Sequence, residues 1–245
     1  MLPVKPPKSI MRQVGRAIAD YAMIRDGDRL LLGLSGGKDS LSLLHILAHL
    51  RRYAPVRFDL GVVTIDPSID GFDPSTLKPY LSELNLPYFY QSQTIAADAK
   101  EHANEPGFSF CAYCARMKRG MIYSTARQHG YGVIVLAQHL DDLAESFLMS
   151  AFHRGQLRTM MAHYTNDQGD LRIIRPLIYV RERQTDAFAR QAELPVVPDN
   201  CPACFRQPTE RQHLKQLLLS EEQHTPTLFK TLLTTMKPLL DGRTH

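Results

Sequence analysis

Short apolar runs alternate with longer segments in which apolar residues recur at three- and four-residue spacing. The runs over residues 30–34 and 133–137 lack polar alternation, which is typical of strands buried on both faces of a sheet. The longer segments, such as residues 39–53, have the spacing of helices with one buried face. This order predicts a doubly wound α/β fold, with a parallel sheet covered by helices.

The same patterns assign most of the chain to individual elements. The expected strands cover residues 30–34, 58–65, 87–91, 133–137 and 172–174. The expected helices cover residues 12–24, 39–53, 74–84, 113–129, 141–153, 181–192, 209–219 and 225–236. An extended segment over residues 194–200 leads into the last helices. The chain after residue 180 is therefore expected to be mainly helical.

A glycine-rich loop joins the strand over residues 30–34 to the next helix. It reads Ser35-Gly36-Gly37-Lys38-Asp39-Ser40. Adjacent glycines let backbone amides approach an anion, and the helix start offers unpaired N–H groups and the positive end of its dipole. The ordinary P-loop pattern fails, since its first glycine would fall on Leu32 and Asp39 replaces its Ser or Thr. We expect a phosphate-binding loop of another kind, and an ordinary glycine-rich turn is the structural alternative.

Polar residues end or follow two other predicted strands. Asp66 ends the second strand, and His139, Asp141 and Asp142 follow the strand over residues 133–137. In a doubly wound sheet, ligands bind beyond the carboxyl ends of the strands. These residues are therefore expected to lie near the glycine-rich loop.

The four cysteines form two CxxC pairs, Cys111/Cys114 and Cys201/Cys204. Without a secretion signal, such pairs favour metal binding over disulfides. Four thiolates on zinc would make a closed structural site, whereas three thiolates on a [4Fe-4S] cluster would leave one iron open to bind sulfur. Redox dithiols or simple packing are the remaining alternative.

Composition and charge add a location and a class of partner. No apolar run among the 245 residues approaches the ~20 needed to cross a bilayer, and the basic, proline-rich N-terminus lacks the apolar core of a signal peptide. We expect a cytoplasmic protein without a membrane partner. The net charge of +4 permits a polyanion partner. Solvated helix faces explain about half of the clustered basic residues, and the rest could line an RNA path; the cluster comprises Arg116, Lys118, Arg119, Arg127, Arg154, Arg158, Arg172, Arg175, Arg181 and Arg183.

Five segments together resemble one enzyme family. Besides the glycine-rich loop, they are residues 111–123, 138–145, 175–182 and 201–212, which occur in the same order over roughly residues 12–219. They resemble the tRNA 2-thiocytidine synthetases, a family of PP-loop ATP pyrophosphatases. The resemblance implies ATP, Mg²⁺ and a [4Fe-4S] cluster as cofactors and tRNA as partner. It also implies that an anticodon-loop cytidine is adenylated and that sulfur from the cluster then replaces its C2 oxygen.

The resemblance also implies a role for each candidate residue. Residues 35–40 would bind the ATP phosphates, and Asp66, His139 and Asp142 would lie by the nucleotide. The implied cluster ligands are Cys111, Cys114 and either Cys201 or Cys204, with Cys201 preferred. The three cysteines, Lys38 and Asp39 form the catalytic set. Asp141 and Asp142 could position Mg²⁺ or water, although helix capping explains at least one of them equally well, and His139 could be structural.

The chain departs from the family pattern at two places. Phe205-Arg206 replaces a common Gly-Ser pair, and Ala137-Gln138 replaces Gly-His. Two alternative functions remain open. One is a PP-loop ligase or amidase with structural zinc, and the other is a non-catalytic ATP- and RNA-binding protein.

We expect further partners besides tRNA. They are a sulfur donor, such as a cysteine desulfurase, and a second copy of the chain that would form a homodimer. We expect an N-terminal helical segment (1–28), a PP-loop ATP-binding domain (29–180) and a helical C-terminal region (181–245) with the second CxxC.

Overall fold

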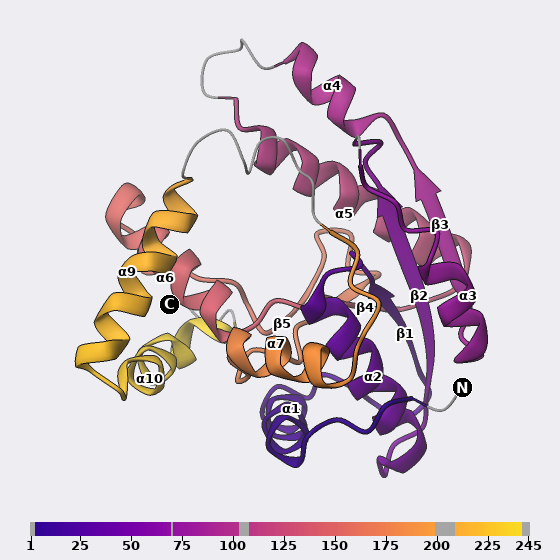
Figure 1. The fold of residues 1–245 in the computed structure, drawn as a ribbon, viewed down its shortest axis with the longest axis horizontal. Coiled ribbons are helices and arrows are strands. Elements are labelled where there is room, and N and C mark those ends of the chain that lie inside the picture. The colour runs from indigo at the N-terminus through magenta and orange to yellow at the C-terminus, as the bar shows by residue number, and fades with distance from the viewer. Residues whose placement is uncertain (1–2, 70, 103–107, 199–208, 242–245) are drawn as a thin grey trace.

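A six-stranded sheet with helices on both faces forms the body of the protein (Figure 1). The computed structural model describes residues 3–69, 71–102, 108–198 and 209–241. The strands are β1 (Asp28–Gly33), β2 (Phe58–Asp66), β3 (Tyr88–Ser92), β4 (Val133–Val135), β5 (His163–Thr165) and β6 (Arg172–Ile174). Their spatial order is β3-β2-β1-β4-β6-β5, and all neighbours are parallel except β5 and β6. This arrangement confirms the expected doubly wound fold.

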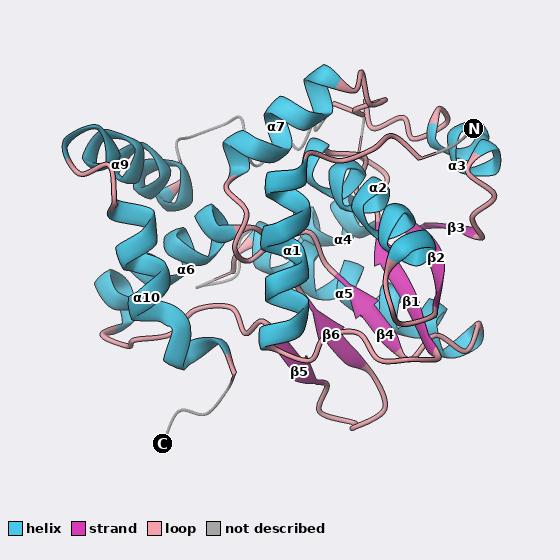
Figure 2. Cartoon of the chain, turned by 90° about the horizontal axis from the view of Figure 1, so that it is seen from below, coloured by secondary structure: helices cyan, strands magenta, loops and turns pink. Residues whose placement is uncertain are grey.

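The helices form two layers over the sheet and a group beside it (Figure 2). They are α1 (Lys8–Asp20), α2 (Lys38–Tyr53), α3 (Leu77–Glu83), α4 (Ile95–Glu101), α5 (Phe110–Gln128), α6 (Leu140–Arg154), α7 (Glu182–Gln191), α9 (Glu210–His224) and α10 (Leu228–Leu240). Figure 2 shows α1, α2 and α7 on one face of the sheet, with α5 on the other. Helices α6, α9 and α10 pack on one another beside the sheet.

Strand β1 shows why the apolar runs lack polar alternation. Leu30 and Leu32 pack into the core cluster that includes α1, α2 and α7, whereas Leu31 packs into the cluster that includes Ala126 of α5. All three leucines are fully buried. Because successive side chains of a strand point to opposite faces, a strand covered on both sides needs apolar residues at every position.

The expected elements are present, with shifted bounds and two omissions. The helix expected over residues 12–24 begins at Lys8, directly after Pro7, and ends at Asp20. The sequence analysis missed α4 and β5, which span seven and three residues. Strand β5 contains no aliphatic residue, unlike the equally short β6, so it lacks the apolar run by which the other strands were predicted. In the described part of the chain, no helix has the length and apolar character that crossing a membrane requires. The division at residues 28 and 180 stays a prediction.

Candidate active site

The glycine-rich loop is a compact turn at the carboxyl end of β1. Gly37 precedes the first turn of α2, and no side chain caps that helix start. Ser35 Oγ accepts a hydrogen bond from the Gly37 N–H at 3.3 Å and lies 3.1 Å from Ser40 Oγ. The uncapped helix start therefore offers backbone N–H groups and a positive dipole end, which is the donor set that a phosphate needs.

Gly36 fits this turn for two separate reasons. Its φ is +85°, in the left-handed region that disfavours residues with a side chain. A Cβ on Gly36 would lie 2.8 Å from Cβ of Val197, whose N–H donates to the Gly36 carbonyl at 3.0 Å. Val197 is buried and precedes Cys201 by four positions. The chain leading to the second cysteine pair thus packs directly on the loop.

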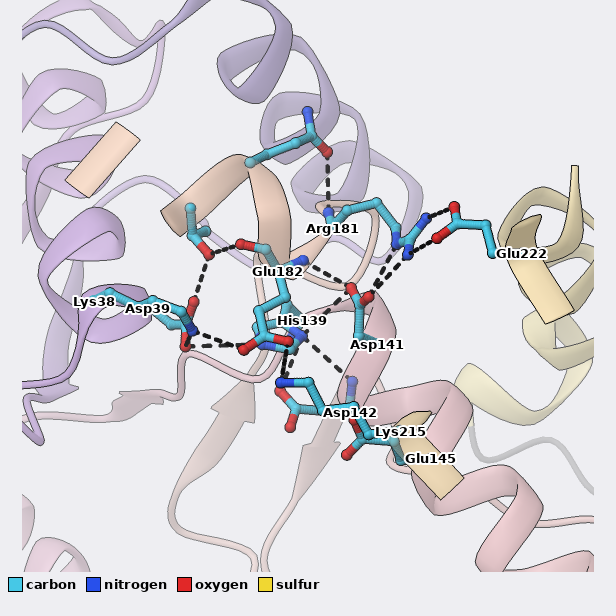
Figure 3. A network of polar contacts seen from close by, with 12 residues as sticks. Lys38, Asp39, His139, Asp141, Asp142, Glu145, Arg181, Glu182, Lys215 and Glu222 are labelled. Atoms are coloured by element: carbon cyan, nitrogen blue, oxygen red, sulfur yellow. Dashed lines mark hydrogen bonds and ion pairs between the residues drawn. The ribbon is translucent and has the colours of Figure 1, made fainter. Parts of the chain in front are cut away.

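Lys38 is held between two carboxylates (Figure 3). Its Nζ donates to Asp39 Oδ2 and to Glu182 Oε1, each at 2.9 Å. Burial alone would lower the pKa of Lys38, but its contacts with Asp39 and Glu182 outweigh burial and raise that pKa. Glu182 Oε2 also lies 2.5 Å from Lys215 Nζ of α9. Burial would raise the pKa of Glu182, but the two lysines hold it at about 2. One carboxylate therefore links the glycine-rich loop to α9.

Asp141 stabilises the start of α7, which carries Glu182. Its buried carboxylate accepts hydrogen bonds from the Glu182 backbone N–H at 2.7 Å and from Arg181 Nε at 3.1 Å. Arg181 also makes a bidentate pair with Glu222 of α9, and its guanidinium carbon lies 3.2 Å from the ring centre of Phe229. Because of these contacts, Asp141 holds the start of α7 in place. Its expected role with Mg²⁺ or water stays a prediction.

His139 and Asp142 cap the start of α6. His139 Nδ1 accepts from the Asp142 N–H at 3.3 Å, and Asp142 Oδ2 accepts from the His139 N–H at 3.0 Å. An accepting Nδ1 leaves the ring proton of a neutral histidine on Nε2. That Nε2 faces Asp39 Oδ2 across 3.7 Å. This geometry agrees with the capping interpretation of Asp142 and with the structural interpretation of His139, and Nε2 of the ring still faces the glycine-rich loop.

A cavity of about 300 Å³ opens beside Lys38 and Asp39. It is lined by Asp39, His139, Asp142, Glu145, Glu182, Thr209, Arg211, Gln212 and Lys215. Within the described ranges, no group of three or more metal-binding side chains is assembled. Mg²⁺ usually takes only one or two carboxylates together with phosphate oxygens, so Asp39 and Asp142 fit such an ion without a complete protein cage.

Several lining residues were missed by the sequence analysis. Glu145 is buried, and burial followed by the nearby Asp142 raises its pKa to about 7 against the opposing charges of Arg211 and Lys215. Glu145 and Glu182 lie inside segments that carry the family resemblance, which was the available signal. Lys215 lies on a helix without a motif, and no sequence signal pointed to it.

The first cysteine pair lies on another helix. Cys111 and Cys114 are in the first turn of α5, where Ser109 Oγ caps the helix by accepting from the Ala112 N–H at 3.4 Å. Cys111 is exposed and Cys114 is half-buried. Residues three apart on a helix share a face, so both sulfurs suit one metal group. Cys201, Cys204, Phe205 and Arg206 lie outside the described residues, and the choice of third ligand stays a prediction.

Asp66 lies at the carboxyl end of β2, which neighbours β1 in parallel. Its carboxylate accepts from the Ser68 N–H at 2.7 Å and from the Tyr90 hydroxyl. It therefore lies at the same edge of the sheet as the glycine-rich loop. No contact with Lys38 or His139 is found among the described residues.

Three of the basic residues considered for an RNA path are structural. Arg172 pairs with Asp28, Arg181 is buried as described above, and buried Arg175 donates to Gln138 Oε1 at 2.9 Å. The RNA-path interpretation is wrong for these three. The same contact gives a reason for one departure from the family pattern, because Gln138 supplies a hydrogen-bond acceptor to Arg175.

Known proteins are similar to this chain in sequence and in fold. A profile of the PP-loop domain family matches residues 7–222. A Geobacter sulfurreducens protein named tRNA-cytidine(32) 2-sulfurtransferase is 42% identical over 226 residues, covering 92% of this chain and 88% of that protein. A Geotalea daltonii protein of the same name is 38% identical over 241 residues, with 96% and 95% covered.

One solved structure has the same overall fold. The U34-tRNA thiolase NcsA from Methanococcus maripaludis, with its [4Fe-4S] cluster, matches with a TM-score of 0.78 at 17% identity, covering 97% of this chain and 79% of that one. At that identity the match supports the fold alone. The profile spans most of the chain, and the sequence relatives cover more than nine-tenths of it. The chain therefore belongs to the PP-loop family and, within it, to the family of the tRNA-cytidine(32) 2-sulfurtransferases.

Proposed function

We propose that this protein is an ATP-dependent tRNA sulfurtransferase that forms 2-thiocytidine at position 32 of tRNA. The observation that carries the proposal is the roughly 40% identity to enzymes of that name across nearly the whole chain. The geometry agrees with it, since carboxylates suited to Mg²⁺ line one cavity at an uncapped helix start, and Lys38 contacts two of them, Asp39 and Glu182. ATP, Mg²⁺ and a [4Fe-4S] cluster are the cofactors.

The first chemical step is adenylation of the base. The C2 oxygen of the cytidine attacks the α-phosphate of ATP, the bond between the α- and β-phosphates breaks, and pyrophosphate leaves. Backbone N–H groups at the start of α2 hold the phosphates, and Lys38 stabilises the charge that develops on pyrophosphate. The phosphates must compete with Glu182 for Lys38. Lys215 then remains as the partner that keeps Glu182 ionised.

The second step exchanges oxygen for sulfur, as AMP leaves C2 and a carbon–sulfur bond forms there. Cys111 and Cys114 would hold the cluster together with Cys201 or Cys204, and the exposure of Cys111 suits a ligand at an accessible site. When bound, such a cluster supplies an iron that can carry sulfur. Sulfur itself comes from a cysteine desulfurase or another donor. The protein is cytoplasmic and forms a homodimer.

The decisive experiment uses protein purified without oxygen. We expect about four irons with matching labile sulfide per chain. With unmodified tRNA, ATP, Mg²⁺ and sulfide, 2-thiocytidine should appear in the digested nucleosides together with AMP and pyrophosphate, and only when ATP is present. Zinc without labile sulfide and no thiolated base would instead indicate a PP-loop ligase or amidase. ATP binding without pyrophosphate release on any tRNA would indicate a non-catalytic binding protein.

A further inference from the structure

The C-terminal end of α6 carries an exposed cluster that the proposed chemistry does not use. We name Phe152, Arg154, Leu157 and Arg158 the α6 tip. Phe152 and Leu157 are exposed, at 60% and 67% of the residue surface, which is unusual for large apolar residues so close together. Both arginines are exposed as well. Within the described part of the chain, neither arginine has a hydrogen-bonding or ion-pair partner for its side chain.

The backbone of the tip is well held. Gly155 ends α6 with a φ of +61°, and the Gln156 N–H donates back to the Ser150 carbonyl at 3.2 Å. Just after the tip, the Thr159 hydroxyl donates to the Leu143 carbonyl at 2.7 Å. This turn fixes the exposed side chains before any partner binds, which lowers the entropy cost of binding.

The tip is continuous with the cavity. Helix α6 starts at the cavity, where it contributes Asp142 and Glu145, and a rise of ~1.5 Å per residue places Phe152 and Arg154 ~15–18 Å from Asp142. Leu157 and Arg158 lie on the segment that returns along α6, since the next residue, Thr159, bonds to Leu143. His153 Nε2 lies 3.3 Å from Glu210 Oε2 in the first turn of α9, and the neighbouring Arg211 also lines the cavity. Figure 1 shows the end of α6 beside the start of α9. The contact between α6 and α9 therefore extends from the α6 tip to the cavity.

We propose that the α6 tip binds single-stranded tRNA nucleotides flanking the base that enters the cavity, an inference that rests on the proposed function. Phe152 provides an aromatic face on which a base stacks, and Arg154 and Arg158 bind the adjacent phosphates. Exposed aromatic rings combined with arginines are typical of single-strand recognition. A basic last turn alone would complement the helix dipole, but that accounts for neither Phe152 nor Arg158.

Binding of an unmodified tRNA transcript, followed by fluorescence anisotropy without ATP, tests the proposal. Phe152→Ala should weaken Kd roughly 5- to 150-fold, because stacking contributes about 1–3 kcal/mol per base, and should leave the salt dependence unchanged. Phe152→Tyr should bind as the unchanged protein does. Arg154→Ala and Arg158→Ala should each reduce the slope of log K against log salt by about 0.7.

Tyr53 provides a matched control. It is 69% exposed at the end of α2, next to Arg51 and Arg52, but at the opposite end of that helix from the glycine-rich loop. Tyr53→Ala should leave tRNA binding unchanged. Unaltered Kd and salt slope in the tip variants would overturn the proposal, as would a changed oligomeric state in Phe152→Ala with unaltered tRNA binding. Since binding is measured without ATP, the result is independent of whether 2-thiocytidine forms.

Discussion

The glycine-rich loop and the first turn of α5 carry the two halves of the proposed chemistry, and the fold holds them in contrasting ways. In the loop, Lys38 has two carboxylate partners and Gly36 packs against buried Val197. At the start of α5, Cys111 is exposed and Cys114 half-buried. The loop is built into the packing of the protein, whereas the exposed thiol adds little to it.

Because of this contrast, substitutions at the two places should differ in their effects on folding stability and on each reaction step. A change in the loop alters packing and charge balance together, so both folding and adenylation should respond. A change at an exposed thiol removes a ligand without disturbing a core, so only sulfur transfer should respond. Variants at the two places can therefore show whether the reaction divides into these two steps.

Cys111→Ala should have the largest effect on activity. We expect 2-thiocytidine formation to be lost and the labile sulfide content to fall, because a cluster ligand is removed. ATP binding should persist. Measured on protein freed of the cluster, the free energy of unfolding should change by less than about 0.5 kcal/mol, because Cys111 is exposed. Nucleoside analysis, sulfide content and chemical denaturation measure the three quantities. Full thiolation by this variant would contradict the cluster role.

Lys38→Ala should slow adenylation roughly 100- to 1,000-fold, the usual effect of removing one group that stabilises transition-state charge. The rate of pyrophosphate release on tRNA measures it. The cluster content should remain unchanged, which is the reverse of the result for Cys111. Lys215→Ala is the matched control, because it removes the other lysine on Glu182 and leaves Lys38 in place. An equal loss in both variants would mean that Lys38 acts only through Glu182.

Gly36→Ala should destabilise the protein by roughly 2–3 kcal/mol, from a left-handed backbone and from the approach of Val197. Gly27 is the matched control, because its φ of +80° is similar and nothing lies near a Cβ placed there. Gly27→Ala should therefore cost only about 1 kcal/mol. Thermal or urea unfolding distinguishes the two. Equal losses would show that the contact with Val197 is unimportant.

The sequence predicted the sheet and the glycine-rich loop because both depend on local patterns. A strand buried on both faces has a continuous apolar run, and the loop follows it directly in the chain. The charge network around Lys38 could not be predicted in the same way. Glu182 is 144 residues away from Lys38, and which carboxylate reaches Lys38 depends on how α7 packs on α2.

Arginine roles show the same limit. Arg175 and Arg158 look equivalent in the sequence, yet Arg175 is buried beside Gln138 and Arg158 is exposed. Local composition gives the number of positive charges, and only tertiary packing decides which of them have partners. The capping role of His139 is intermediate, because a residue before a helix suggests it but the geometry is needed to establish it.

The smallest expected effect is that of Glu145→Gln on the pH dependence of stability. It would show whether Glu145, unlike the neighbouring Asp142, holds a proton in the folded protein. Burial raises the pKa of Glu145 to about 7, above the value of about 4.5 expected in the unfolded chain. Between those values the folded protein holds the proton more tightly, so stability falls as pH rises through 7. Glu145→Gln should flatten this fall and, at pH 8, raise the free energy of unfolding by roughly 1–2 kcal/mol after solvent screening in an open cavity. Urea unfolding at pH 5 and pH 8 measures both. An unchanged slope would mean that Glu145 is ionised in the folded protein, in which case the cavity carries another negative charge beside Asp142 and suits Mg²⁺ rather than proton transfer.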